Sequence, residues 1–410
     1  MKWASVISTR PSLEAAIGEA VAAATSALGQ PADLAFVFIS NAFASEFSRV
    51  MPLLQSQLGE VPILGCGGSG VIGQDDQNIP QEIEDEAALS LTLAALPEVR
   101  IQPFYILPNQ LPDLDSAPDL WVDLMGVAPA DEPHFILLGD AMSARINDLL
   151  QGLDYAYPQA IKIGGLTLGA STSNSGLFYQ GKLYAEGIFG VALSGNIVVE
   201  AIVAQGCRPV GPLLRVAEAD RNVLLQVEAQ PGSGDRAAVD TKVQTALEAL
   251  HRTLDHMDDD DRTMAQNALS IGIVRDAFKV QLQAGDFLIR NLIGVDPRIG
   301  AIAVGDRVRP GQRVQFHIHD AETSAEDLEE LLQQYQETQP CLPAGVLLFD
   351  CLGRGEQFYG QPNFDTRLLR HYFPNAPIGG FFCQGEIGPI GGATFLHGYT
   401  AAIGLFRPRE

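Results

Sequence analysis

One pattern recurs three times along the chain and constrains the possible folds more than any other feature. An apolar run typical of a buried strand precedes a segment with helical spacing, a short second strand and a glycine-rich ending. The three copies cover residues 33–70, 134–165 and 345–380. Strands that alternate with helices predict βαβ units with parallel strands, and right-handed crossovers would bring the glycine endings to the same edge of their sheets.

The remaining segments predict a mixed α/β fold with two domains, 1–209 and 210–410. Strand candidates follow the three glycine endings, at residues 87–96, 101–107, 182–193, 196–204 and 398–406. The region 213–340 has a different pattern, with strands expected near 223–228, 278–283, 285–292 and 313–319 and helices near 237–255 and 323–336. We expect two similar lobes, each a mixed β-sheet covered by helices, with repeated strand-helix-strand-GlyGly units. The acidic segment 73–86 is expected to form a mobile loop.

The charge and the cysteines of the chain limit its partners and its compartment. A formal net charge of −24 disfavours binding to nucleic acid or to anionic membranes, because both require a cationic surface. The N-terminus lacks the apolar core of a signal peptide, and no apolar run has the length of a transmembrane helix. The five cysteines include no C-x-x-C pair, which argues against a disulfide framework or a structural zinc site. We therefore expect an acidic protein of the cytoplasm.

The third copy of the repeated pattern carries the most distinctive charged residues. Glu386 is the only acidic or basic residue other than histidine between His371 and His397, in a segment rich in glycine and apolar residues. A carboxylate in such surroundings needs a partner, which is either the guanidinium of Arg354 or the ammonium group of a ligand. An Arg354–Glu386 pair would be suited to reading a zwitterion.

Cys351 lies directly after a predicted buried strand and three residues before Arg354. A neighbouring guanidinium can lower the pKa of a thiol, which makes it more nucleophilic and more easily oxidised. Free cysteines also serve as small hydrophobic core residues. Cys351 is therefore a pocket-lining residue, a redox sensor or a nucleophile, although no general base stands at a diagnostic spacing.

The segment Gly65–Gly70 fits the dinucleotide fingerprint G-x-G-x-x-G after a strand. That fingerprint also requires a helix at this point, whereas an acidic sequence interrupted by Pro80 follows. A turn that lines a pocket is the favoured interpretation. Its candidate backbone donors, with those of the other two copies, are Gly65, Gly67, Ser69, Gly164, Gly165 and Gly380.

Three further positions have both a binding and a structural interpretation. Arg290 lies in an apolar strand-like run, where it can clamp a ligand carboxylate or form a salt bridge with a carboxylate of its own domain. His317 and His319 share one strand face, a spacing that suits a metal, but no third ligand is visible nearby. His397 is a candidate ligand-facing imidazole or axial haem ligand, or a hydrogen-bonded wall residue.

Motifs spread over nearly the whole chain are similar to those of one known family. They lie at residues 65–70, 187–195, 206, 287–293, 311–320, 350–355, 385–388 and 397–400. With these motifs the chain resembles the FIST module, whose N-terminal and C-terminal halves occur in bacterial sensory proteins and in some F-box proteins. The resemblance implies a small-ligand sensor domain, with amino acids among the proposed ligands, and some bacterial members are haem-binding nitric-oxide sensors.

The sequence and the resemblance together favour a cytoplasmic, non-catalytic ligand-binding sensory protein with an amino-acid-like ligand. A haem-binding nitric-oxide sensor, with haem as cofactor, is the alternative, and an enzyme or redox sensor that depends on Cys351 is the third. A separate signalling protein is the expected partner, since no output domain is recognisable in the sequence. No metal site is expected. The candidate ligand-binding residues are Gly65, Gly67, Ser69, Gly164, Gly165, Arg290, Cys351, Gly353, Arg354, Gly355, Gly380, Gly385, Glu386 and His397.

Overall fold

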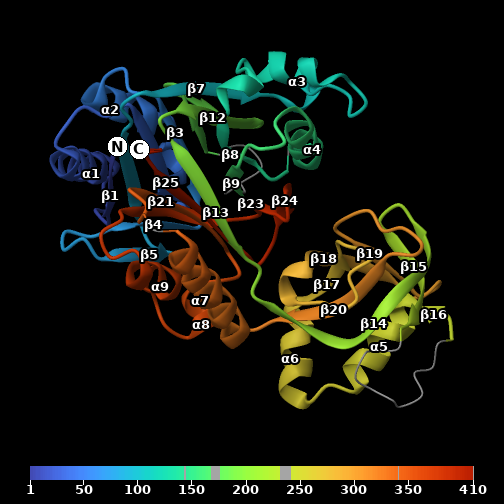
Figure 1. Ribbon diagram of the computed structural model, residues 1–410. Helices are drawn as coiled ribbons and strands as arrows, with labels where there is room; N and C mark the ends of the chain where they lie inside the picture. Colours follow the sequence, from blue (N-terminus) through green and yellow to red (C-terminus); the bar gives the residue numbers. More distant parts are fainter. Residues whose placement is uncertain (143–144, 168–175, 231–241, 340, 410) are drawn as a thin grey trace. The chain divides into compact units, whose positions relative to one another are not determined.

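The computed structural model describes residues 1–142, 145–167, 176–230, 242–339 and 341–409. It divides into two compact units: unit 1 comprises residues 1–204 and 328–410, and unit 2 comprises residues 205–327. Figure 1 follows the chain through both units. The predicted mixed α/β architecture with two lobes and helix-covered sheets is confirmed. None of the described helices is long and apolar enough to cross a membrane.

Unit 1 contains three copies of one topological unit, which we call repeats 1, 2 and 3. Repeat 1 comprises β1 (Lys2–Ser8), α1 (Leu13–Leu28), β2 (Leu34–Ser40), α2 (Phe47–Leu58), β3 (Ile63–Gly68), β4 (Gly70–Gln74), β5 (Pro80–Glu84) and β6 (Leu89–Ala95). Repeat 2 comprises β7 (Val99–Ile106), α3 (Pro118–Met125), β8 (His134–Asp140), α4 (Ile146–Ala156), β9 (Lys162–Thr167), β10 (Leu177–Tyr179), β11 (Lys182–Tyr184) and β12 (Ile188–Gly195).

Repeat 3 begins with β13 (Val198–Ala204), and the chain then forms unit 2 before the repeat continues. Its remaining elements are α7 (Ala321–Thr338), β21 (Gly345–Cys351), α8 (Glu356–Tyr359), α9 (Phe364–Tyr372), β22 (Ile378–Cys383), β23 (Glu386–Ile390), β24 (Ala393–His397) and β25 (Ala401–Arg407). The helix predicted over 323–336 is therefore part of α7. Unit 2 is thus inserted after the first strand of repeat 3, and it includes the start of α7, residues 321–327.

The three predicted βαβ units are confirmed. The strand pairs β2–β3, β8–β9 and β21–β22 are each parallel, and each is joined by a helix. On the other side of β2, β8 and β21 lie the antiparallel strands β6, β12 and β25, followed by β1, β7 and β13. Each repeat therefore forms the same mixed sheet.

Each repeat also contributes a β-hairpin to the sheet of another repeat. The hairpin β4–β5 of repeat 1 pairs with β22 of repeat 3, β10–β11 of repeat 2 pairs with β3 of repeat 1, and β23–β24 of repeat 3 pairs with β9 of repeat 2. The exchange is cyclic and ties the three sheets together. The loop expected over 73–86 is therefore wrong for residues 73–74 and 80–84, because β22 of the neighbouring sheet supplies backbone partners for β4, and β4 in turn pairs with β5.

The recurring glycines have a packing role that the three repeats share. Gly65, Gly164 and Gly380 occupy equivalent register positions. A Cβ atom at each would lie 1.7 Å from the Val37 carbonyl oxygen, 1.8 Å from that of Leu137 and 1.8 Å from that of Leu348. Only glycine permits the paired strands to approach this closely.

These glycines lie within strands, so the predicted pocket-lining turn is wrong for Gly65 and Gly67, which belong to β3. Gly67 packs on Phe47, and Gly165 packs on the Cys383 sulfur, so neither leaves space for a side chain. The segment that follows Gly70 is the strand β4, whereas a dinucleotide site requires a helix here.

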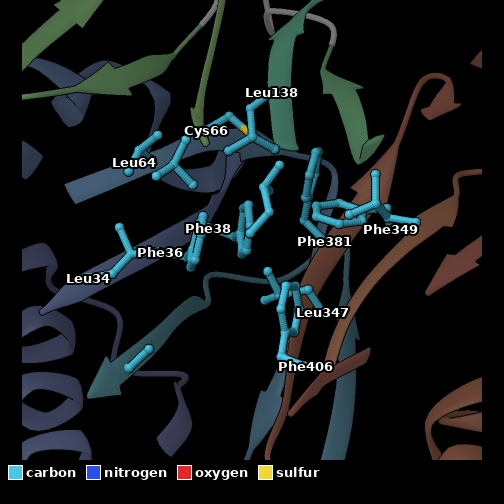
Figure 2. Packing of buried hydrophobic residues seen from close by; sticks show 14 of the residues in the cluster. Leu34, Phe36, Phe38, Leu64, Cys66, Leu138, Leu347, Phe349, Phe381 and Phe406 are labelled. Carbon is cyan, nitrogen blue, oxygen red and sulfur yellow. The ribbon is translucent and has the colours of Figure 1, made fainter. Parts of the chain in front are cut away.

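The inner faces of the three sheets share one hydrophobic core, shown in Figure 2. Phe38, Leu138 and Phe349 occupy equivalent positions in β2, β8 and β21, and all three are fully buried. Burying a side chain of this size contributes about 1.5–3 kcal/mol. The helices cover the outer faces, as α1 and α2 do for repeat 1.

Unit 2 is built on one antiparallel sheet of seven strands, in the order β14-β20-β17-β18-β19-β15-β16. Their bounds are β14 (Cys207–Asp220), β15 (Val223–Ala229), β16 (Gln244–Thr245), β17 (Leu269–Val274), β18 (Phe287–Asp296), β19 (Ala301–Val304) and β20 (Arg313–His319). The helices α5 (Ala246–Asp255) and α6 (Asp259–Ala268) accompany this sheet. The strands predicted near 223–228, 285–292 and 313–319 are confirmed.

Two predictions in unit 2 need correction. The strand expected over 278–283 is wrong, because Asp286 accepts hydrogen bonds from the Lys279 ammonium and the Gln283 amide, which holds the segment in turns. The helix expected from residue 237 begins at Ala246 instead, where Thr245 and Glu248 form a capping box. Residues 237–241 of that prediction lie outside the described residues.

Candidate functional site

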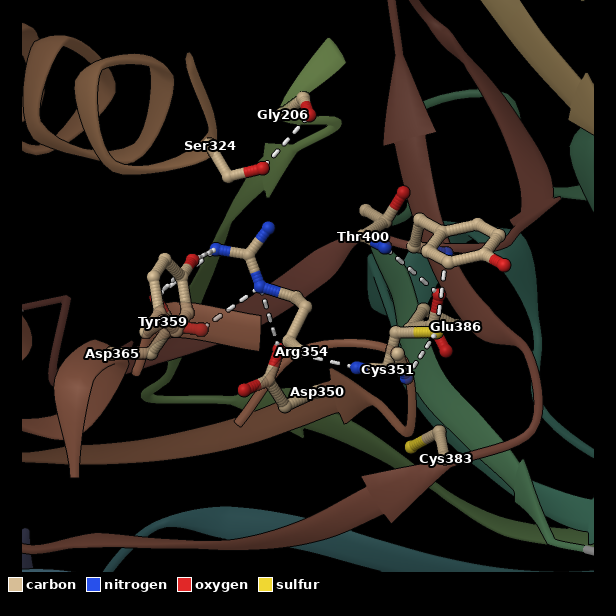
Figure 3. Close-up of polar contacts among 12 residues, drawn as sticks. Gly206, Ser324, Asp350, Cys351, Arg354, Tyr359, Asp365, Cys383, Glu386 and Thr400 are labelled. Atoms are coloured by element: carbon tan, nitrogen blue, oxygen red, sulfur yellow. Dashed lines mark hydrogen bonds and ion pairs between the residues drawn. The ribbon is translucent and has the colours of Figure 1, made fainter. Parts of the chain in front are cut away.

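The candidate site lies where β21 of repeat 3 ends. Asp350 and Cys351 are its last residues, and the chain then turns through Gly353 and Arg354 into the single-turn helix α8. The turn between β22 and β23 brings Glu386 close to Cys351 (Figure 3). Asp350 and Cys351 thus follow the apolar, buried residues of β21 at the end of that strand.

Arg354 is the centre of a buried polar network (Figure 3). Its Nε lies 3.1 Å from Asp350 Oδ1 and 2.9 Å from Asp365 Oδ2, and its Nη2 lies 3.0 Å from Asp365 Oδ1. The Tyr359 hydroxyl accepts a hydrogen bond from Nη2 and donates one to Asp365 Oδ1 over 3.0 Å. The bidentate contact with Asp365 fixes the orientation of the guanidinium.

The hairpin β4–β5 of repeat 1 supplies two further carboxylates to this region. Glu82 is buried, and its Oε1 accepts a 2.8 Å hydrogen bond from the Thr366 amide at the start of α9. Glu84 accepts a 2.8 Å bond from the Glu356 amide at the start of α8. A Cβ atom at Gly355, whose φ is +85°, would lie 2.5 Å from Glu84 Oε2, so this glycine permits the contact.

We call Arg354, Asp350, Asp365, Tyr359 and Glu82 the Arg354 cluster. Three of its buried polar atoms have no hydrogen-bond partner in the described part of the chain. They are the Arg354 Nη1 donor and the acceptors Asp350 Oδ2 and Glu82 Oε2. An unsatisfied buried polar group costs about 1–3 kcal/mol, and more if it is charged. One cationic donor and two carboxylate acceptors are therefore available to a molecule that brings complementary groups.

Burial dominates the ionisation of the cluster. It raises the pKa of Asp350 well above its usual range, and the Asp365 carboxylate adds to the effect while Arg354 opposes it. Burial and Asp365 likewise raise the pKa of Glu82 to about 7. The cluster thus holds more carboxyl groups than its single guanidinium can neutralise, and protons make up the difference.

Glu386 and Cys351 form the neighbouring part of the site. Glu386 accepts hydrogen bonds from the Thr400 amide at 3.3 Å and the Gly385 amide at 3.2 Å, yet burial raises its pKa to about 8. The Cys351 sulfur accepts from the amides of Gly353 and Tyr399, at 3.4 and 3.1 Å. Burial and then the Glu386 charge raise the pKa of the thiol, which is opposite to the lowering that a neighbouring guanidinium can cause and that the reactive interpretation of Cys351 requires.

The predicted ion pair between Arg354 and Glu386 is also replaced by different contacts. Among the described residues, the carboxylates within salt-bridge distance of Arg354 are those of Asp350 and Asp365. Glu386 is held by backbone amides instead. Sequence spacing could not reveal this, because Asp365 reaches the guanidinium only after α9 has folded back against the end of β21.

Repeats 1 and 2 show what the same backbone positions contain without such a site. The strand register makes Ile39 and Gly139 the equivalents of Asp350. In the same way, Val71 and Leu177 are the equivalents of Glu386. The fold therefore accepts apolar residues or glycine at the positions where repeat 3 buries carboxyl groups.

Several predicted site residues lie elsewhere or have structural contacts. Arg290 belongs to unit 2 and pairs with Asp306 at 2.9 Å, which is the salt bridge weighed as its structural interpretation. Ser69 is exposed between β3 and β4. The buried His397 hydrogen-bonds through Nε2 to the Gly388 carbonyl at 3.0 Å. Gly385 packs close to Leu396.

The two histidines of β20 are also engaged. His317 Nδ1 lies 3.0 Å from the Gln315 carbonyl, and burial lowers the pKa of this imidazole to about 4. His319 Nε2 lies 3.1 Å from the Ser270 hydroxyl. No group of three His, Cys, Asp or Glu side chains suited to a metal ion occurs within the described ranges.

Sequence reasoning missed four residues of the cluster: Glu82, Asp350, Tyr359 and Asp365. Asp350 carried a usable signal, since it follows four apolar residues in the same strand. Asp365 and Tyr359 look like ordinary helix residues in the sequence. Glu82 stands in a segment with several other carboxylates, so nothing local distinguishes it.

Comparison with known proteins identifies the family to which the chain belongs. The FIST N domain matches residues 33–230 and the FIST C domain matches residues 246–389, so the chain belongs to the FIST family. FIST domains are generally sensory, ligand-binding modules of signal transduction.

Similar proteins occur in bacteria and in a plant. "Uncharacterized protein MT0656" of Mycobacterium tuberculosis is 31% identical over 98% of both chains. "Uncharacterized protein Mb0898c" of Mycobacterium bovis is 28% identical, over 98% of this chain and 97% of the relative. The F-box/LRR-repeat protein At5g63520 of Arabidopsis thaliana is 23% identical, over 88% of this chain and 75% of its own length.

Among solved structures, a cyanuric acid hydrolase from A. caulinodans covers the whole chain at 10% identity, with a TM-score of 0.33. A second cyanuric acid hydrolase structure covers 50% of the chain, with a TM-score of 0.25.

Proposed function

We propose that this protein is a cytoplasmic, non-catalytic sensor that binds an amino-acid-like ligand at the Arg354 cluster of repeat 3. The observation that carries the proposal is the set of three unpartnered, buried polar atoms, Arg354 Nη1, Asp350 Oδ2 and Glu82 Oε2. A zwitterion supplies one group of each required kind. Membership of a family of ligand-binding sensory modules supports the proposal.

In this proposal the ligand carboxylate accepts a hydrogen bond from Arg354 Nη1. Asp365 and Tyr359 already fix the guanidinium, so little conformational entropy remains to be lost on binding. The ligand ammonium donates to Asp350 Oδ2 and Glu82 Oε2 and replaces the protons that these carboxyl groups otherwise hold. In a buried environment, such charge-assisted hydrogen bonds are stronger than in water.

The other functions considered from the sequence receive less support. The raised pKa of Cys351 keeps its thiol protonated, which disfavours an enzyme or redox sensor that relies on a thiolate. His397 Nε2 is hydrogen-bonded to a carbonyl oxygen and so carries a proton, which does not suit a nitrogen that would bind haem iron. We propose that a separate signalling protein receives the output, and that neither nucleic acid nor a membrane is a partner.

A thermal-shift screen of the amino acids, followed by calorimetric titration of the best ligand, tests this proposal. Glu82→Gln and Arg354→Lys should each weaken binding at least about tenfold, because each loses one charge-assisted bond. Arg367→Gln is the matched control, since Arg367 is an exposed arginine of α9 that contacts Gln361 and the Asn363 carbonyl. An absorbance spectrum after haem addition runs in parallel.

Two results would contradict the proposal. One is that Glu82→Gln and Arg354→Lys bind the ligand as tightly as the wild-type protein while remaining folded. The other is a Soret band that appears with haem and is lost in His397→Ala, which would favour the gas-sensor alternative.

A further inference from the structure

Unit 2 contains a cavity of about 240 Å³ that is separate from the Arg354 cluster. It lies between β14, the end of β15 and helix α5. The lining residues are Gly211, Pro212, Leu214, Ala229, Gln244, Ala249, Arg252, Thr253 and His256. For comparison, an apolar cavity of about 150 Å³ is large enough to bind benzene.

An irregularity in β14 creates this space. The register between β14 and β20 is interrupted between Val210 and Leu214, so the intervening residues leave the ladder. Gly211, with a φ of +68°, lies so close to Thr253 of α5 that a Cβ atom would be 2.7 Å from its Cγ2 atom. The interruption therefore brings Gly211 against α5 and leaves the cavity beside this contact.

The wall of the cavity is mainly apolar, with Leu214, Ala229 and Ala249 all buried. Gln244 Oε1 is a buried acceptor with no hydrogen-bond partner in the described part of unit 2. Such an atom costs free energy unless a donor reaches it. An occupant with an N–H group would satisfy it.

Arg252 supplies positive charge at the rim. It is exposed, and its charge is one of the causes that lower the pKa of Glu248, four residues earlier in α5. His256 lies one helical turn further along, and its Nδ1 is 2.7 Å from the Arg252 carbonyl. An exposed guanidinium suits an anionic group at the mouth of the cavity.

We propose that this cavity binds a small aromatic carboxylic acid that carries an N–H donor. The ring fills the apolar space, the N–H group donates to Gln244 Oε1, and the carboxylate pairs with Arg252. This site is independent of the amino-acid site proposed for repeat 3, so either can fail without the other.

Titration of the full-length protein with indole-3-acetate, monitored by ligand-observed NMR and calorimetry, tests this inference. Indole is the matched probe without the carboxylate. Arg252→Gln should weaken indole-3-acetate binding about tenfold and leave indole binding unchanged. Gln244→Leu should weaken both probes, and Ala249→Leu, which fills the cavity, should abolish both. Arg298→Gln is the control, because Arg298 is an exposed arginine of unit 2 that does not line the cavity.

The melting temperature of each variant establishes that it is folded. No saturable binding of indole-3-acetate up to millimolar concentration overturns the proposal. Binding that persists in a folded Ala249→Leu variant overturns the location. Equal affinities for indole and indole-3-acetate overturn the role of Arg252 and the carboxylic-acid class.

Discussion

Repeat 3 differs from repeats 1 and 2 in the chemistry of its strand ends and not in its backbone. All three repeats have the same strand order, the same exchanged hairpin and the same closely packed glycine. Only repeat 3 places carboxyl groups at positions that Ile39, Gly139, Val71 and Leu177 occupy in the other two. Burying a carboxyl group is costly. A buried carboxyl group at a position where the same fold also accepts an apolar residue or glycine is therefore a good candidate for function.

The largest effect is expected from transferring the charge of repeat 3 into repeat 1. Val71→Glu places a carboxyl group in the apolar core without the amides that hold Glu386. We expect a loss of about 3–5 kcal/mol in the free energy of unfolding, because the new group is buried and unpaired. Urea denaturation measures it, and Glu386→Gln, which keeps an acceptor for the amides, should change stability by less than about 1 kcal/mol. If the two variants lose equal stability, repeat 3 does not differ from repeat 1 in the way argued.

The shared glycine tests the common backbone of the repeats. Gly164→Ala forces β8 and β9 apart, since the new Cβ atom would lie 1.8 Å from the Leu137 carbonyl oxygen. We expect a destabilisation of about 2–3 kcal/mol by urea denaturation, and similar values for Gly65→Ala and Gly380→Ala. A variant that is as stable as wild type would show that the repeats do not depend on this close approach.

The buried carboxyl groups of the candidate site, Glu82 from repeat 1 and Glu386 from repeat 3, should make stability depend on pH. The pKa of Glu82 is raised to about 7 and that of Glu386 to about 8, so these groups keep protons in the folded protein that the unfolded chain releases. Their contribution to stability is therefore complete at pH values below the usual glutamate range and is lost as pH rises through about 7 to 8. Urea denaturation between pH 5 and 8.5 should show falling stability, and Glu82→Gln should flatten the slope.

The same groups link ligand binding to pH. A bound ammonium replaces protons on Asp350 and Glu82, so affinity for an amino-acid-like ligand should rise with pH in the range where these groups titrate. Calorimetry in two buffers of different ionisation enthalpy measures the protons released. Affinity that is independent of pH would mean that the ligand does not contact these carboxyl groups.

The smallest effect is expected at a glycine that has no packing role. Gly18 lies in the interior of α1, and nothing lies within 4 Å of a Cβ atom built there. Gly18→Ala should stabilise the protein by about 0.5–1 kcal/mol, because glycine loses more backbone entropy in a helix. Thermal unfolding measures it, and destabilisation would indicate a contact that the structure lacks.

The sequence by itself determined the repeating βαβ units, because alternating apolar runs, helical spacing and glycines are local patterns. It also identified Arg354 and Glu386 as residues that need partners. It did not determine the partners, since Asp365 and Glu82 reach Arg354 and its neighbours only through the folding back of α9 and the exchange of a hairpin from repeat 1. The hairpin β4–β5 looked like an acidic loop for the same reason: its pairing strand is about 300 residues away in the sequence. Burial and the Glu386 charge raise the pKa of Cys351, whereas the Arg354 guanidinium, which could have lowered it, pairs with Asp350 and Asp365.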